Sequence, residues 1–191
     1  KRLKNKNMIS IVDYGLGNQG SICNMIKKIG AQTKVASNGD EILNAEKLIL
    51  PGVGSFETGM NHIRERNLLD SLQQKVLGEK IPILGICFGH QIISKELGGR
   101  VKKNKSREFG SAKVKKINKS ILTKNFFNKG ENNVWMSHAD EVIKLPKNFK
   151  VVAKSSNSKL CIVENTKKNL YGIQFHPEVT HTNNGKIILK N

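Results

Sequence analysis

The segment Gly85-Ile86-Cys87-Phe88-Gly89 constrains the fold of this chain more than any other. An apolar run at 81–84 precedes it, and residues 90–97 after it have the apolar spacing of an amphipathic helix. A strand that turns sharply into a helix at a nucleophile between glycines is a nucleophile elbow, here with Cys in place of Ser. The N-terminus of the following helix favours a thiolate at this position. The segment therefore predicts a buried strand, a tight turn at Cys87 and chemistry at its sulfur.

The first half of the chain alternates between strand and helix patterns. Strands are predicted at 8–12, 33–36, 47–50 and 81–86, with helices at 21–29 and 57–77. This alternation is typical of a doubly wound α/β fold, in which a mostly parallel central sheet has helices on both faces.

After Gly98-Gly99 the pattern changes to short strand-like runs separated by polar turns. These runs lie at 111–117, 134–136, 149–153, 160–163 and 171–175, and a last helix is expected at 185–190. They predict a smaller antiparallel strand region beside the parallel sheet. We expect one domain over residues 1–191, with 1–7 as a basic N-terminal tail.

A second motif, His176-Pro177-Glu178, supplies the base that a cysteine nucleophile needs. It follows the strand predicted at 171–175. Residues i and i+2 of an extended segment point to the same side, so the Glu178 carboxylate can orient the His176 imidazole. Functional groups of a doubly wound sheet gather at the carboxyl ends of its strands, where we expect Cys87 and His176 to meet.

The other cysteines, Cys23 and Cys161, lie in apolar segments and are predicted to be buried hydrophobic residues. Three widely spaced cysteines form neither a zinc-binding pattern nor a disulfide framework. The apolar runs are also too short to span a bilayer. We therefore expect no metal, no membrane association and a cytoplasmic location.

Cysteine chemistry on an acyl group also needs hydrogen-bond donors for the developing oxyanion. One candidate is the backbone N–H of Phe88, directly after the nucleophile. The other is the loop Pro51-Gly52-Val53-Gly54, with Val53 as the donor. An ordinary strand-to-helix turn explains this loop equally well.

Residues 15–20 form a G-x-G-x-x-G pattern after the first predicted strand, which resembles a dinucleotide-binding loop. Asp40, the acidic residue that would bind the ribose, falls in a polar turn beyond the second predicted strand. A nucleotide would also leave the cysteine, histidine and glutamate without a role. We therefore expect no nucleotide or other cofactor.

The formal net charge of +18 has two interpretations. A basic surface attracts nucleic acid, anionic substrates or acidic partners, whereas a lysine-rich composition without functional meaning gives the same charge. The lysines are spread along the chain, and no nucleic-acid-binding motif accompanies them. We therefore favour the compositional interpretation and expect no nucleic acid partner.

Two motifs, residues 85–91 (GICFGHQ) and 175–178 (FHPE), resemble those of the triad-type class I glutamine amidotransferases. The likeness extends over the chain from Met8 onward. It implies that Cys87 attacks the side-chain amide of glutamine, that His176 transfers the proton and that Glu178 orients His176. Ammonia then leaves, and water releases glutamate from a thioester.

The same resemblance implies four residues that hold the substrate glutamine. They are Gln91 and the segments around Gly52, Ser137 and His138. It also explains the glycine pattern at residues 15–20 as a loop of the family.

The two halves of the chain resemble different members of the family. Residues 13–18 and 50–56 are similar to the glutaminase subunit of imidazole glycerol phosphate synthase. Residues 107–110, 134–140 and 176–182 resemble the glutaminase part of GMP synthase instead. The loop at 51–54 favours the first group, which also includes sugar-modifying relatives, and GMP synthase is the alternative.

No synthase motif accompanies the glutaminase motifs, so the resemblance implies that a separate synthase, or a synthase domain outside this chain, accepts the ammonia. A heteromer with that synthase is expected. The alternative of another class is a catalytically idle module that keeps the fold for docking or nucleic-acid contact.

Overall fold

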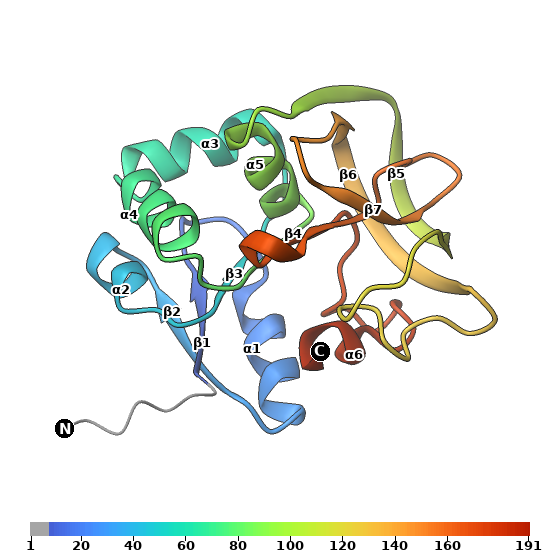
Figure 1. The fold of residues 1–191 in the computed structure, drawn as a ribbon, viewed down its shortest axis with the longest axis horizontal. Coiled ribbons are helices and arrows are strands. Elements are labelled where there is room, and N and C mark those ends of the chain that lie inside the picture. The colour runs from blue at the N-terminus through green and yellow to red at the C-terminus, as the bar shows by residue number, and fades with distance from the viewer. Residues whose placement is uncertain (1–7) are drawn as a thin grey trace.

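The computed structural model describes residues 8–191, and for residues 104–107 it describes the backbone only. The predicted basic tail at 1–7 lies outside the described residues, as does the side chain of Arg107. The described strands form one sheet with the order β2-β1-β3-β4-β9-β8-β7-β5-β6 (Figure 1).

The first five strands of that order run parallel. They are β2 (Gln32–Ala36), β1 (Met8–Val12), β3 (Leu48–Leu50), β4 (Ile83–Ile86) and β9 (Leu170–Ile173). The other four pair antiparallel. They are β8 (Ile162–Asn165), β7 (Lys150–Lys154), β5 (Arg100–Lys116) and β6 (Glu131–Lys144). Strand β9 joins the two parts, because it is parallel to β4 and antiparallel to β8.

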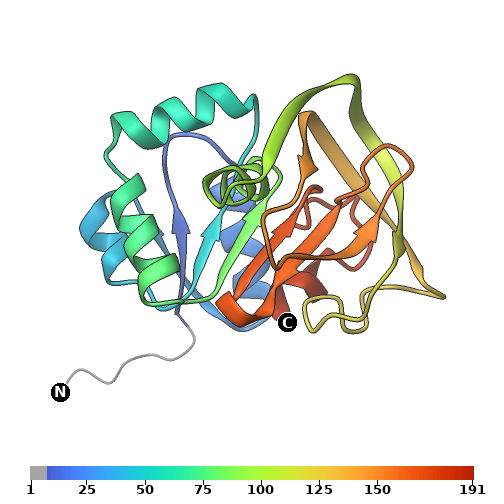
Figure 2. The same ribbon diagram turned by 45° about the horizontal axis from the view of Figure 1, so that its top comes forward.

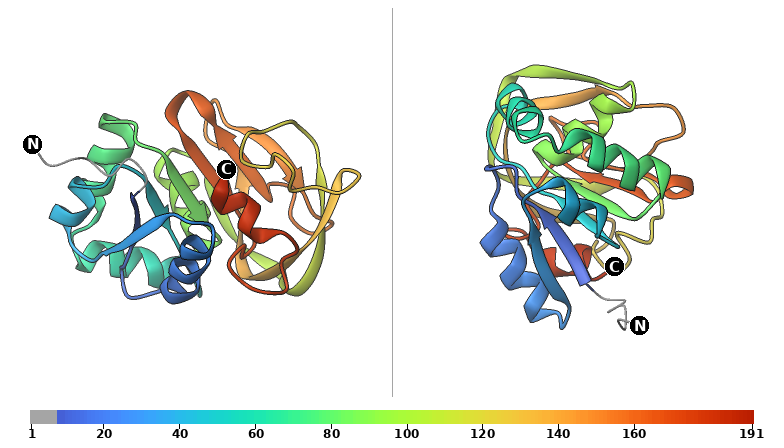
Figure 3. Two further views of the ribbon diagram at one scale, coloured as in Figure 1. Left: turned by 90° about the horizontal axis from the view of Figure 1, so that it is seen from below. Right: turned by 90° about the vertical axis from the view of Figure 1, so that its left-hand side faces the viewer.

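Helices cover both faces of the parallel part (Figures 1 and 3). One face carries α1 (Gln19–Lys28) and α6 (Gly185–Lys190), and apolar residues such as Ile22, Ile26 and Ile188 pack there. The other face carries α2 (Gly39–Leu43), α3 (Phe56–Glu65), α4 (Leu69–Gln73) and α5 (Phe88–Glu96). The predicted parallel sheet with helices on both faces and an added antiparallel region is confirmed.

Two helix predictions need correction. The long helix expected at 57–77 is divided into α3, α4 and a π-helical turn at Gln74–Gly78. The division lies at Asn67, whose φ of 53° is left-handed, a conformation that Asn tolerates better than most residues. The turn expected around Asp40 is the short helix α2, which the Asn38 side chain caps by accepting from the Glu41 N–H at 3.0 Å.

The strands β5 and β6 are much longer than the runs predicted at 111–117 and 134–136. Together they form a long antiparallel ribbon that curves beside the parallel part, as the view in Figure 2 shows. The longest parts that were not predicted, 100–110 of β5 and 137–144 of β6, are largely polar, because one face of such a ribbon is open to solvent and needs no apolar residues. None of the helices in residues 8–191 has the length and apolar character needed to cross a membrane.

Candidate active site

Cys87 lies at the sharp turn between β4 and α5. Its φ of 52° and ψ of −106° are strained for a residue with a side chain, and its N–H donates to the Ile173 carbonyl at 2.7 Å. The flanking glycines leave no room for a side chain. A Cβ on Gly85 would lie 2.5 Å from the carbonyl carbon of Gly89, and one on Gly89 would lie 1.9 Å from the Leu50 oxygen. Close backbone packing therefore explains the two glycines of this turn.

His176 and Glu178 follow β9 and form a buried pair. The Nδ1 atom of His176 lies 2.9 Å from Oε1 of Glu178. The segment is anchored to β6, since the His176 N–H donates to the Trp135 carbonyl at 3.1 Å. The Thr182 hydroxyl adds a second link, because it accepts from the Trp135 N–H at 3.0 Å and donates to the His176 carbonyl at 2.5 Å.

The electrostatics of the pair favour a charged imidazole. Burial lowers the pKa of His176, but its interactions with Cys87 and Glu178 outweigh burial and raise that pKa to about 10. The Nε2 atom is buried without a hydrogen-bond partner in the described structure. The structure thus brings the sulfur, the imidazole and the carboxylate together, with one ring nitrogen available for proton transfer.

The loop 51–54 packs against the elbow. A Cβ on Gly52 would lie 2.3 Å from Cβ of Phe88. The Tyr14 hydroxyl donates to the Pro51 carbonyl at 2.6 Å, and burial and the charge of Cys87 raise the pKa of Tyr14. Val53 and Phe88, the two predicted oxyanion donors, therefore lie on segments in direct contact.

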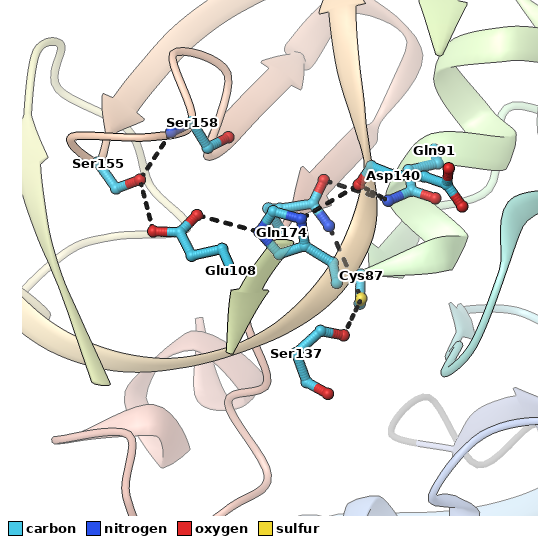
Figure 4. Close-up of polar contacts among 9 residues, drawn as sticks. Cys87, Gln91, Glu108, Ser137, Asp140, Ser155, Ser158 and Gln174 are labelled. Atoms are coloured by element: carbon cyan, nitrogen blue, oxygen red, sulfur yellow. Dashed lines mark hydrogen bonds and ion pairs between the residues drawn. The ribbon is translucent and has the colours of Figure 1, made fainter. Parts of the chain in front are cut away.

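The residues predicted to hold glutamine lie around the sulfur in different ways (Figure 4). The Ser137 carbonyl accepts from the Cys87 sulfur at 3.6 Å. Gln91 is buried, and its Nε2 donates to the Asp140 carbonyl at 2.6 Å. The His138 ring instead contacts Glu108, with Nε2 3.2 Å from Oε2, and its Nδ1 lies 3.1 Å from the Asp140 carbonyl oxygen.

Sequence reasoning missed one residue that touches the sulfur. The side chain of Gln174 is fully buried, and its Nε2 lies 3.7 Å from the Cys87 sulfur. Gln174 precedes His176 by two residues, just as Glu178 follows it by two. The alternation that paired His176 with Glu178 could therefore have indicated Gln174 as well.

The two other cysteines are free thiols. Cys161 is buried in the core, and Cys23 is half-buried on α1. His90 packs against Gly172, and burial lowers its pKa to about 4. His181 is exposed and stacks on Trp135, with ring centroids 4.5 Å apart.

The glycine loop at 15–20 holds the side chain of Asp13. The Asp13 carboxylate accepts from the Gly15 N–H and from Nε2 of Gln19, both at 2.8 Å. A carboxylate at this place repels a phosphate, so the loop is poorly suited to a dinucleotide. The described residues contain no cluster of His, Cys, Asp and Glu that could hold a metal ion.

A protein family and several known proteins match most of this chain. The model of the family described as "Glutamine amidotransferase class-I" matches residues 10–191. Imidazole glycerol phosphate synthase subunit HisH 2 of Methanococcus maripaludis is 40% identical, and the alignment covers 91% of this chain and 93% of that protein. The GMP synthase of Petrotoga mobilis is 37% identical over 96% of this chain.

Among solved structures, the chain is similar to a protein of Thermoplasma acidophilum that is provisionally assigned as one of the subunits of a GMP synthase. The TM-score is 0.84 with 29% identity, covering 96% of this chain and 90% of the other. The chain spans only 30% to 36% of the length of the GMP synthases that align with nearly all of it.

Proposed function

This chain belongs to the class I glutamine amidotransferases, and we propose that it hydrolyses glutamine to glutamate and ammonia and passes the ammonia to a synthase partner. The observation that carries the proposal is the buried His176–Glu178 pair, whose Nδ1 and Oε1 atoms are 2.9 Å apart, together with the raised pKa of that ring, to which Cys87 on its strained turn contributes. The family membership supports the same reaction.

In the first half of the reaction, the Cys87 thiolate attacks the side-chain carbonyl carbon of glutamine. The backbone N–H groups of Phe88 and Val53 stabilise the oxyanion of the tetrahedral intermediate. His176, protonated because its pKa is raised, gives its proton to the departing nitrogen, so ammonia leaves and a glutamyl thioester remains.

In the second half, water attacks the thioester carbonyl. His176, now neutral, accepts the proton of that water, and the sulfur leaves as a thiolate. Glutamate is released, and the thiolate and imidazolium are restored. Glu178 keeps Nδ1 as a donor throughout, so that Nε2 is the nitrogen that exchanges protons.

A docked synthase is part of the proposal, because free ammonia is protonated in neutral water and lost. Two apolar side chains near the site are exposed in a way that suits a protein partner. They are Val53, 37% exposed on the loop 51–54, and Phe109, 64% exposed opposite Ser137 on β5.

We propose an imidazole-glycerol-phosphate-synthase-like partner as the first candidate, in histidine synthesis or in a related sugar modification. The loop 51–54 beside the nucleophile and the HisH 2 relative, aligned over 93% of its length, favour it. GMP synthase is the second candidate, favoured by the Thermoplasma acidophilum structure and by the resemblance of residues 134–140 and 176–182.

The test is glutamate release from glutamine by the purified chain and by Cys87→Ala, each alone and with the proteins that co-purify with the chain from its own cells. We expect release by the wild type and none above background by the variant. A barrel protein among the co-purified partners would indicate the first candidate, and a nucleotide-activating enzyme the second. A wild type no faster than Cys87→Ala with its partner present would instead indicate an idle docking module.

A further inference from the structure

The amide of Gln174 lies against the sulfur of Cys87, and we propose that this amide positions the Cys87 thiolate by donating a hydrogen bond to it. The inference rests on the proposed glutaminase function and adds a positioning residue to it. Gln174 is fully buried directly after β9, and its Nε2 is 3.7 Å from the sulfur (Figure 4). Buried amides need partners, and the sulfur is the partner of this one.

The orientation of the Gln174 amide follows from its neighbours. The Asp140 carbonyl can only accept, so the atom of Gln91 that lies 2.6 Å from it must be the nitrogen. That nitrogen is also 3.5 Å from the Gln174 side chain, which must therefore present its oxygen to Gln91. The nitrogen of Gln174 is then the atom that faces Cys87.

The two polar partners of the sulfur act in different protonation states. As a thiol, Cys87 can donate to the Ser137 carbonyl, 3.6 Å away. As a thiolate, Cys87 has no proton to donate, and a carbonyl oxygen repels its charge. The Gln174 amide is then the uncharged donor that still suits it, and hydrogen bonds to charged groups are among the stronger ones.

The titratable groups around the sulfur come from two segments: His176 and Glu178 follow β9, and Tyr14 follows β1. Strand β6 contributes an uncharged group, the Ser137 carbonyl. His176 supplies the positive charge that favours the thiolate. Gln174 is uncharged, so its hydrogen bond orients the sulfur and adds no net charge.

The position of Gln174 is coupled to the other side of the site. Gln91 links Gln174 to the backbone of Asp140 on β6. The Asp140 carboxylate in turn accepts from the Phe56 N–H at 2.9 Å, at the end of the loop that carries Val53. These contacts therefore connect the Cys87 sulfur to the loop that carries Val53, the proposed oxyanion donor.

The experiment measures alkylation by iodoacetamide, whose carboxamide resembles the side chain of glutamine. Gln174→Met removes the hydrogen-bond donor and keeps a side chain of similar size. Gln73→Met, at an exposed position of α4, is the matched control. Peptide mapping measures the extent of alkylation of Cys87, Cys23 and Cys161 in the same sample. At pH 7 we expect Cys87 of Gln174→Met to react about tenfold more slowly than in wild type and control. Rates measured over a range of pH give a profile for each protein, and the profile at Cys87 of Gln174→Met should differ from that of the control.

The internal thiols separate positioning from loss of structure. Cys23 should react equally in all proteins, and Cys161 should stay unlabelled, because burial in the core raises the pKa of its thiol. If Gln174→Met exposes Cys161, Gln174→Leu takes its place, because its side chain is also apolar and cannot donate. Equal alkylation of Cys87 in wild type and the intact variant would overturn the proposal, as would no reaction at wild-type Cys87. Alkylation needs no turnover of glutamine, so failure of the glutaminase function itself would appear separately, in the comparison with Cys87→Ala.

Discussion

The parallel and antiparallel parts of the sheet contribute different things to the candidate site. The parallel part supplies the nucleophile at the end of β4 and the loop after β3. The segment after β9, the strand that joins the two parts, supplies the imidazole, the carboxylate and the Gln174 amide. Strand β6 of the antiparallel part supplies anchors that hold this segment, so the site depends on how β9 joins the two parts.

The largest effect should come from removing one group from each part. Cys87→Ala and His176→Ala should each lower the rate of glutamine hydrolysis about 10⁴-fold, because the two groups act as a unit. The double variant should then be no slower than either single variant. Rates with the partner present give the measurement, and fully multiplicative losses would show that the two parts act independently.

The next effect concerns the link between His176 and Glu178. Glu178→Gln should lower the hydrolysis rate about 10²-fold or more, mainly in kcat, because the ring loses the acceptor that orients it. Glu65→Gln, on the exposed end of α3, is the control. A change confined to KM would instead assign Glu178 to substrate binding.

A smaller effect is expected at the junction between α5 and β3. Gly89→Ala places a Cβ 1.9 Å from the Leu50 carbonyl oxygen, and the backbone must shift. We expect a loss of about 3 kcal/mol in the free energy of unfolding, measured by urea denaturation. Gly20→Ala is the matched control, since no atom lies within 4 Å of its added Cβ. Equal stability of the two variants would contradict the tight packing of the elbow.

The smallest effect should come from the anchor of the His176 segment to β6. Thr182→Val keeps the shape but removes the hydroxyl that joins the Trp135 N–H to the His176 carbonyl. We expect a loss of about 1–2 kcal/mol in stability, because two buried backbone groups lose a partner. Exposed Thr180→Val is the control, and a loss no larger than in this control would show that the anchor is unimportant.

The two parts also differ in how well the sequence predicted them. The first four parallel strands were predicted closely, because buried strands read as continuous apolar runs, whereas the helix predicted at 57–77 is divided into three pieces. Of the ribbon, only the last part of β5 and a short run near the start of β6 were predicted, since the missed residues form no continuous apolar run. Helix α2 was missed because its five residues are too few to show a period, although Asn38 and Glu41 carry a capping signal.

The candidate site shows the same contrast. Cys87, His176 and Glu178 could be found because each lies in a short motif whose geometry follows from local rules. The contact of Gln174 with the sulfur joins residues 87 positions apart. The pairing of the His138 ring with Glu108 depends on the register of β5 and β6. Alternation could have placed Gln174 on the same side of the segment as His176, but its contact with the sulfur and the His138–Glu108 pair both required the structure.

The central claim is that the Cys87 sulfur and the His176 ring act on each other across the two parts. An NMR titration of the His176 ring tests this most directly, in the wild type and in Cys87→Ala. The account predicts that the wild-type ring titrates near pH 10, and that removal of the sulfur lowers its pKa toward the ordinary value of 6.5. The ring's contribution to stability should then be complete below about pH 6.5 and lost as the pH rises through about 10 in the wild type. An identical titration in the two proteins would contradict the account, because the sulfur and the ring would then not interact.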